Sequence, residues 1–188
     1  MAELPRVYLR PLRARDAAEL IRLNRASRRL HGRYMAAPRH PSEFAAALRR
    51  SRRANVDVSL VCGREDDAIA GVITLSEIVH GNLRSAYMGY YVGAPFSGQG
   101  YMTAGLTLVL RHAFGALRLH RVEANIQPGN EPSIRLVKRL GFTREGFSRR
   151  YLRIAGRWRD HERWAILAED WRRARRGRAR RPRSRTRR

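Results

Sequence analysis

Apolar and polar positions follow two periods along the chain, and together they predict a mixed α/β fold. Short runs rich in Val, Ile and Tyr have the pattern of strands, and longer segments repeat apolar residues every three or four positions, as helices do. The predicted order is β-α-α-β-β-β-α-β-α-β-β, a mixed, mostly antiparallel sheet with helices on both faces. The predicted strands cover residues 7–11, 56–63, 68–79, 86–92, 119–127, 142–154 and 158–167. Asp16 is predicted to cap the first helix, and the other predicted helices begin at Ser42, Tyr101 and Glu131. The last of them is predicted to end at Leu140, before Gly141, and residues 31–41 form a predicted loop.

The stretch 86–110 is the segment that says most about function. Residues 86–92 are aromatic and β-prone, and residues 93–100 hold three Gly and one Pro, which predicts a turn. A helix with one apolar face follows from Tyr101. Such a strand, turn and helix leaves unpaired N–H groups at the helix start, where a phosphate is the usual anion. Gly98 and Gly100 would let a phosphate approach the backbone closely, although a tight turn without a ligand has the same sequence.

Charge separates the chain into a body and a tail. The net charge is +24, and of the 40 basic residues only Lys138 is a lysine. Residues 172–188 hold eleven Arg and no acid, which leaves +13 on the rest of the chain. We therefore predict a folded domain over residues 1–171 and a disordered Arg-rich tail over 172–188. A cationic body favours anionic partners such as nucleic acid or a phosphorylated cofactor, although a solvated arginine-rich surface explains part of the excess.

The sequence also argues against a disulfide and a membrane span. Cys62 is the only cysteine, so no intramolecular disulfide can form, and its strand-like neighbours predict a buried thiol. No apolar run approaches the 18 or so residues of a membrane span, and residues 1–6 lack the apolar centre of a signal peptide. We therefore expect a cytoplasmic protein.

Four motifs in this order resemble the GNAT acetyltransferase superfamily. Residues 97–102 (SGQGYM) resemble its pyrophosphate-binding loop, and residues 130–142 (NEPSIRLVKRLGF) resemble its second motif. Residues 6–12 (RVYLRPL) and residues 156–161 (GRWRDH) are similar to the RimJ/RimL-like branch, which contains the ribosomal-protein N-terminal acetyltransferases. The resemblance implies a GNAT fold with a splayed central strand, acetyl-CoA as the donor and no metal.

The resemblance also implies a set of cofactor contacts. The loop would bind the phosphates through backbone N–H groups, and the end of the central strand would pair with the pantetheine arm. Ser97 replaces the usual Gln or Arg, and Met102 replaces the usual Gly or Ala; both still offer backbone N–H groups. Arg135, Lys138 and Arg139 either reach the nucleotide phosphates or form a solvated helix face. The expected cofactor-binding residues are Tyr91, Val92, Ser97, Gly98, Gly100, Tyr101, Met102, Thr103, Asn130, Ser133 and Lys138.

Catalytic roles are less evident in the sequence. Many members carry a catalytic Tyr seven residues after the motif Asn, where this chain has Val137. In this branch Ser133, one turn past Asn130, is a candidate to protonate the leaving thiolate, although it also suits a local helix cap. Glu77 is our candidate general base, against the alternative of a partner for a surface arginine. Weaker candidates are Glu123 and His161.

The lack of an evident base favours an α-amine as the acceptor. An α-amino group has a pKa near 7.8 and lysine near 10.4, so deprotonating the lysine costs about 3.5 kcal/mol more. The leading hypothesis is therefore an N-terminal protein acetyltransferase of RimJ type, in which the amine attacks the thioester directly. A small-molecule amine acetyltransferase and a basic RNA- or ribosome-binding protein with little catalysis remain as alternatives. The sequence does not define the oligomeric state.

Overall fold

Seven strands form one sheet in the order β1-β2-β3-β4-β5-β7-β6. The computed structural model describes residues 5–32 and 34–179. All neighbouring strands pair antiparallel except β4 and β5, which are parallel. The mixed, mostly antiparallel sheet predicted from the sequence is therefore confirmed. The strands are β1 (Val7–Pro11), β2 (Val56–Gly63), β3 (Ile69–Val79), β4 (Ser85–Val92), β5 (Arg121–Ile126), β6 (Thr143–Ile154) and β7 (Arg157–Leu167).

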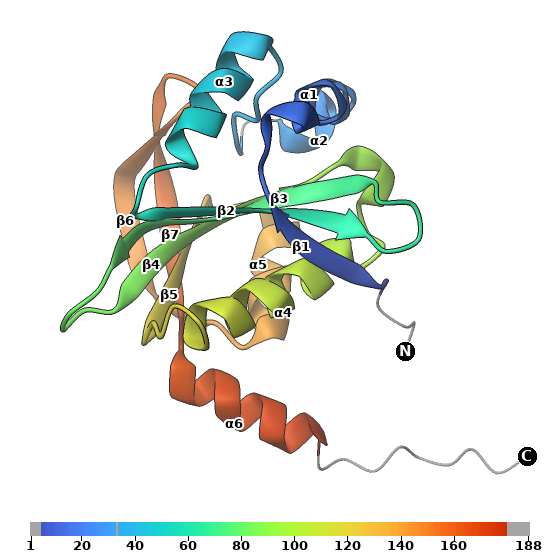
Figure 1. Ribbon diagram of the computed structural model, residues 1–188. Coiled ribbons are helices and arrows are strands. Elements are labelled where there is room, and N and C mark those ends of the chain that lie inside the picture. Colours follow the sequence, from blue (N-terminus) through green and yellow to red (C-terminus); the bar gives the residue numbers. More distant parts are fainter. Residues whose placement is uncertain (1–4, 33, 180–188) are drawn as a thin grey trace, which may run out of the picture.

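Helices cover both faces of the sheet, as the sequence also predicted (Figure 1). One face carries α1 (Ala17–Ala26), α2 (Arg28–His31) and α3 (Pro41–Arg50). The other carries α4 (Tyr101–Phe114) and α5 (Glu131–Leu140). Two 3₁₀ turns, η1 (Ala14–Asp16) and η2 (Ala94–Phe96), precede α1 and α4, and α6 (Ala168–Ala179) follows the last strand. None of the described helices is long and apolar enough to cross a bilayer.

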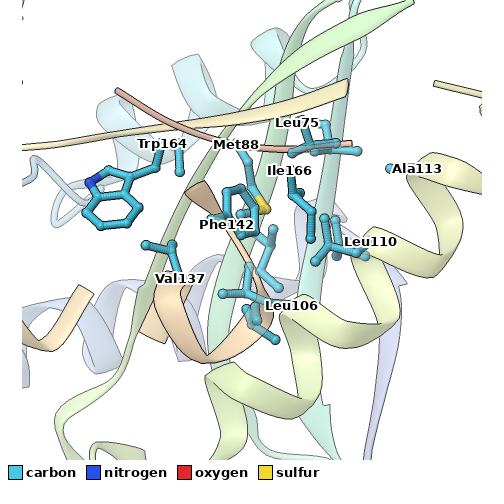
Figure 2. Packing of buried hydrophobic residues seen from close by; sticks show 14 of the residues in the cluster. Leu75, Met88, Leu106, Leu110, Ala113, Val137, Phe142, Trp164 and Ile166 are labelled. Carbon is cyan, nitrogen blue, oxygen red and sulfur yellow. The ribbon is translucent and has the colours of Figure 1, made fainter. Parts of the chain in front are cut away.

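The larger core lies between the sheet and the pair α4–α5. Leu106 and Leu110 of α4 and Val137 of α5 are fully buried against strand residues such as Met88 and Ile166 (Figure 2). A smaller core on the opposite face holds Leu20, Phe44 and Cys62. Cys62 is buried, as predicted, and this burial raises its pKa. The two cores pack against opposite faces of the sheet and so fix the positions of the strand ends that carry the site.

Several element boundaries differ from the sequence predictions. Residues 28–31 form α2, although the sequence predicted that a loop begins at His31. Asp16 does not cap α1 with its side chain; the carboxylate accepts hydrogen bonds from Arg10 Nη1 (2.9 Å) and the Arg13 N–H (2.7 Å). The carboxylate thus caps the preceding turn η1 through the Arg13 N–H, and the ion pair with Arg10 satisfies its buried charge.

The chain remains helical beyond the predicted domain boundary. Trp171 is 5% exposed, and the five residues after it, 172–176, are exposed, so Trp171 packs against the core as expected. Its ring lies 6.5 Å from that of Phe114, centroid to centroid. The helix α6 nevertheless continues to Ala179, so the first part of the Arg-rich tail is ordered as helix. Residues 180–188, the rest of the predicted tail, lie outside the described residues.

Candidate active site

The parallel strands β4 and β5 separate halfway along their length. They pair at only three positions, the last being Tyr87 with Glu123. Beyond this point β4 stays paired with β3 as far as Val92, while β5 stays paired with β7 as far as Ile126. The sheet therefore opens between residues 88–92 and residues 124–126, and this confirms the expected splay of the central strand.

The splay exposes backbone hydrogen-bonding groups to the gap. The Gly93 N–H donates to Ala70 O of β3 at 2.8 Å. Because hydrogen-bonded pairs alternate in an antiparallel ladder, Tyr91 also directs its peptide groups at β3, and Tyr90 and Val92 direct theirs at the gap. His31 Nε2 donates to Val92 O at 3.0 Å, which leaves the Val92 N–H for a ligand. Of the two residues expected to pair with pantetheine, Val92 thus faces the gap with its main chain and Tyr91 does not.

The turn after β4 ends in a helix start made of backbone donors. Gly98 and Gly100 have φ of +77° and +88°, a region that side chains disfavour. A β-carbon on Gly98 would meet nothing within 4 Å, so the space beside it is open. Gly100 is the N-cap of α4 without a side chain, and the N–H groups of Tyr101, Met102 and Thr103 have no acceptor within the helix. These are the features of a phosphate site.

Both departures from the family loop fit the fold. Met102 points into the larger core and is 7% exposed. A β-carbon on Gly71 of β3 would lie only 2.8 Å from the Met102 Cε. The absence of a side chain at Gly71 therefore makes room for Met102. Ser97 is exposed on the turn. The loop therefore keeps its backbone donors, and its bulky residue packs away from the ligand side.

Two hydroxyl groups meet on the α5 side of the gap. Tyr90 Oη lies 2.5 Å from Ser133 Oγ, and it also lies 3.5 Å from the Ser133 carbonyl oxygen. Burial raises the pKa of Tyr90 to about 12, against the opposing effect of the Ser133 hydrogen bond. The Ser133 side chain therefore forms its hydrogen bond with Tyr90 of the central strand β4, and it does not cap its own helix. In the sequence, Tyr90 is marked only by its place two residues before Val92, so its part in the site was not predicted.

The next residue on β4 faces the opposite side. Tyr91 Oη accepts a hydrogen bond from Asn24 Nδ2 at 3.3 Å, and the Tyr91 ring packs edge-on against His31 with centroids 5.1 Å apart. Asn24 is fully buried and also donates to Pro38 O at 2.8 Å. Burial raises the pKa of Tyr91 to about 12 and lowers that of His31. Neutral aromatic and amide groups thus line this side of the strand.

The second motif places Asn130 at the start of α5 and its basic residues on the helix surface. Asn130 is the N-cap residue, but its side chain makes no capping hydrogen bond. Lys138 Nζ lies 5.5 Å from the centre of the Trp164 ring, a cation–π contact that holds it over β7. Arg135 pairs with Glu131 at 3.7 Å, and Arg139 is exposed. Val137 is buried in the core, so that position offers no proton donor.

The carboxylates considered as bases lie at the other end of β4. Glu77 is exposed within a bulge of β3, has φ +49°, and accepts a hydrogen bond from Asn55 Nδ2 at 3.1 Å. Tyr90 pairs with Ile73 of β3, and Glu77 lies four residues further along β3. Glu77 is therefore about 13 Å along the strand from the hydrogen-bonded pair Tyr90–Ser133. Glu123 pairs with Arg121 at 2.8 Å. The structure does not bring Glu77 together with Ser133.

His161 is buried on β7. Its Nδ1 donates to Arg159 O at 3.0 Å, which assigns the proton to Nδ1 because a carbonyl can only accept. Burial lowers its pKa, and the Tyr151 ring lies edge-on at 6.2 Å. Nε2 therefore carries the free lone pair. No group of three or more side chains suited to metal binding occurs among the described residues.

Comparisons with known proteins agree with this geometry. Residues 6–143 match the family model described as an acetyltransferase (GNAT) domain. The probable N-acetyltransferase YjcK of Bacillus subtilis (strain 168) is 32% identical over 173 residues, which are 87% of this chain and 95% of that protein. The ribosomal protein uS5-alanine N-acetyltransferase of Escherichia coli (strain K12) is 38% identical over 107 residues, 57% of this chain and 55% of that enzyme. This second match therefore spans about half of each protein.

A solved structure has the same fold. Mycobacterium smegmatis RimJ in complex with CoA-disulfide is 34% identical and superposes with a TM-score of 0.78. The match covers 87% of this chain and 82% of that chain. The likeness therefore extends over most of both proteins, and the RimJ-like resemblance inferred from the four motifs is confirmed.

Proposed function

This chain belongs to the GNAT acetyltransferase family, and on that premise we propose that it transfers an acetyl group from acetyl-CoA to the N-terminal α-amine of a protein. The observation that carries the proposal is the splay of β4 from β5, because the glycine turn and Ser133 meet around it. A GNAT enzyme is an N-acetyltransferase; the α-amine and the protein substrate are the finer part of the proposal.

The residues around the splay fit CoA. Gly98 and Gly100 keep the turn free of side chains, and the start of α4 presents N–H groups to an anion. The Val92 N–H faces the gap and would hold an extended amide-bearing arm by main-chain pairing. When bound, acetyl-CoA supplies an acetyl group activated as a thioester. The described residues do not support an acyl-enzyme: Cys62 is buried in the smaller core, and Ser133 has no histidine or carboxylate hydrogen-bonded to it that could activate it.

In the proposed reaction, the leaving sulfur and the acceptor amine lie on opposite faces of β4. The Tyr90 N–H, which also faces the gap, would polarise the carbonyl of the thioester as negative charge develops on its oxygen. Ser133, on the α5 side, would donate its hydroxyl to the leaving sulfur. The acceptor amine would enter from the face of α1–α3, where burial lowers the pKa of His31 and so disfavours a positive charge that would repel it.

Among the described residues no carboxylate forms a hydrogen bond with Ser133, and the nearby Glu131 pairs with Arg135, which favours an α-amine over a lysine side chain. Glu77 and Glu123 are engaged by Asn55 and Arg121 in the paired half of β4. An α-amine has a pKa near 7.8 and is substantially neutral at about pH 7.5, so it needs only a water relay. A lysine would need a strong base to overcome about 3.5 kcal/mol more. His161 Nε2 is the alternative proton acceptor among the described residues.

The comparison with the Escherichia coli enzyme supports a ribosomal protein as the substrate. That enzyme acts on the alanine of ribosomal protein uS5, and it shares 38% identity over 107 residues. A cytoplasmic protein with a basic surface would meet this substrate at the ribosome, whose surface is largely phosphate. The net charge of +24 also disfavours polycationic small molecules, which are the main alternative acceptors.

One experiment tests the acceptor class. The full chain is incubated with labelled acetyl-CoA and three matched acceptors: a peptide with a free N-terminal Ala, the same peptide with a blocked N-terminus and one Lys, and spermidine. We expect the label only on the first, at its α-nitrogen by mass spectrometry. Label on the lysine or on spermidine would replace the α-amine proposal. No transfer to any acceptor, with tight RNA binding, would favour the RNA-binding alternative.

A further inference from the structure

We propose that Tyr90 is a positioning residue for Ser133, in which the phenol donates to Ser133 Oγ and leaves the serine proton directed at the departing sulfur. The two oxygens are 2.5 Å apart, a short hydrogen bond between side chains 43 positions apart in the sequence. The inference rests on acetyl transfer from acetyl-CoA, and it holds for any acceptor.

Chemistry decides the direction of this hydrogen bond. A phenol is more acidic than an alcohol, so the proton between the two oxygens belongs to Tyr90. Because burial raises the pKa of Tyr90 to about 12, the phenol stays protonated and always has a proton to donate. Its second acceptor, the Ser133 carbonyl oxygen, is distant at 3.5 Å. An accepting hydroxyl keeps its own hydrogen free to donate, and a chain of two donors polarises each bond.

Position decides to which atom the serine hydroxyl donates its hydrogen bond. Tyr90 directs its peptide groups into the gap and its side chain toward α5, while Ser133 lies on the first turn of α5. The strand and the helix thus each contribute one hydroxyl beside the gap that would hold the thioester. No other side-chain acceptor for Ser133 Oγ occurs among the described residues.

The step balances without an added reagent. The bond from the amine nitrogen to the acetyl carbon forms, the carbon–sulfur bond breaks, and its electron pair goes to sulfur. Ser133 stabilises that charge by hydrogen bonding, with Tyr90 behind it. The proton released by the amine passes to water, and the thiolate takes up a proton from water. Tyr90 and Ser133 end the step as they began it.

Tyr91 is a matched control on the same strand. It is adjacent to Tyr90, has a buried hydroxyl with a pKa raised to about 12, and points to the opposite face. Tyr91→Phe and Tyr90→Phe therefore remove the same atom from similar surroundings. Only the second removes a donor to Ser133.

The first test measures binding and not turnover. The full chain and its variants are saturated with CoA, and thiolate absorbance is followed against pH, with CoA-free protein subtracted to remove Cys62 and the tyrosines. A donor to sulfur lowers the pKa of the bound thiol, so we expect Tyr90→Phe and Ser133→Ala to weaken its ionisation about tenfold. Tyr91→Phe should leave it unchanged. A thiol pKa unaffected by Tyr90→Phe would overturn the proposal.

The second test is a double-mutant cycle on turnover. Tyr90→Phe should lower kcat about tenfold and leave KM for acetyl-CoA within twofold, because the phenol acts through Ser133. The double variant should be no slower than Ser133→Ala alone. Independent, multiplying effects would show that Tyr90 acts on its own, and would also overturn the proposal.

A third variant covers the case in which Tyr90→Phe unfolds, which thermal melting would reveal. A ring-fluorinated tyrosine at position 90 keeps the shape and the hydroxyl but ionises at lower pH. Burial and the Ser133 hydroxyl are the influences on Tyr90 ionisation in the described chain, and no charged group contributes. We expect activity and thiol acidity to be lost at a lower pH than in the natural protein; an unchanged alkaline limit would count against the role.

These outcomes separate the inference from the proposed function. A shift of the bound thiol pKa in Tyr90→Phe, together with transfer to a lysine or a small amine, would retain Tyr90 and reject the α-amine. If the natural protein acetylates an α-amine and the bound thiol has the same pKa in Tyr90→Phe as in Tyr91→Phe, the proposed function would stand and the role of Tyr90 would be rejected.

Discussion

The two halves of β4 are built in opposite ways. Around the half paired with β5, residues 85–87, the polar side chains of the neighbouring strands already have partners. Arg121 of β5 forms ion pairs with Glu123 and Glu145, and Asn55 donates a hydrogen bond to Glu77 of β3. In the open half, residues 88–92, the backbone faces a gap and the nearby helix start has N–H groups without helical acceptors. Satisfied polar groups stabilise a fold, whereas groups left without partners are available to a ligand. The site therefore belongs to the open half.

Ion pairs connect the strands beside the paired half. Two hydrogen bonds from Arg121 to Glu145 lower the pKa of Glu145 and raise that of Arg121. Tyr87, which ends the pairing, has its pKa raised to about 12, mainly by its hydrogen bond with Tyr151. This half sets where the splay begins, and the following predictions test whether chemistry stays confined to the open half.

The largest effect should come from the serine of the open half. Ser133→Ala should lower kcat by about 10- to 1000-fold, the scale of one acid–base group, and leave acetyl-CoA affinity nearly intact. Steady-state kinetics and calorimetry measure the two quantities separately. A variant at full rate would mean that Ser133 only braces Tyr90 and that water or the substrate serves the leaving group.

A charge placed in the turn should affect binding more than rate. Gly100→Asp adds a carboxylate and a β-carbon at φ +88°, where the phosphates are expected. Like-charge repulsion and steric exclusion should weaken acetyl-CoA binding by at least ~2 kcal/mol, about 30-fold. Gly156→Asp, also at positive φ but in the β6–β7 turn, is the control for backbone strain. An unchanged dissociation constant for Gly100→Asp would remove the cofactor assignment.

The Arg-rich end should act on partners and leave the site untouched. Arg175 stacks on Trp171 at 5.8 Å, so a cut after Trp171 would disturb α6, and we place it after Ala179. This cut removes six Arg, and the slope of log RNA affinity against log salt should become shallower by about 4 units. Acetylation of a free peptide should stay normal.

Replacement of the same six Arg separates charge from chain length. Six Lys should restore the natural slope and six Gln should not, because counterion release depends on charge. Identical slopes for the full-length and shortened proteins would mean that the tail has no role in nucleic-acid binding.

The smallest effect is expected in the paired half. Glu77→Gln keeps an acceptor for Asn55 and removes only the charge. If the carboxylate is structural, kcat/KM should stay within about twofold across the pH range. A large loss at neutral pH, recovered at high pH where the amine is already deprotonated, would restore Glu77 as the general base.

The sequence predicted most of the fold because its signals are local. β1, β2 and α5 begin and end at the predicted residues, and the other predicted helices and strands lie within a few positions of those observed. Gly141 ends α5 at φ +95°, as predicted for a glycine cap. The turn at 98–100 likewise follows from its glycines, since few other residues adopt that backbone.

Contacts between distant residues were outside the reach of these signals. Lys138 lies over Trp164, a residue 26 positions further along the chain, and the local sequence pattern did not indicate that contact. Tyr90 and Tyr91 are identical neighbours, and nothing in their order indicates that one would meet Ser133 and the other Asn24. The missed α2 is a single turn, too short for periodicity to reveal.

By itself, the sequence determined the order of helices and strands, the glycine-built helix start and the family, because backbone preferences and apolar periods are written within a few consecutive residues. The tertiary structure alone decided which side chains meet at the splay. Strand alternation sends Tyr90 to α5 and Tyr91 to α1, and the packing of α5 on the sheet brings Ser133 within 2.5 Å of Tyr90. Such a contact depends on the register of the strands and the placement of a helix, and both are fixed only when the core closes.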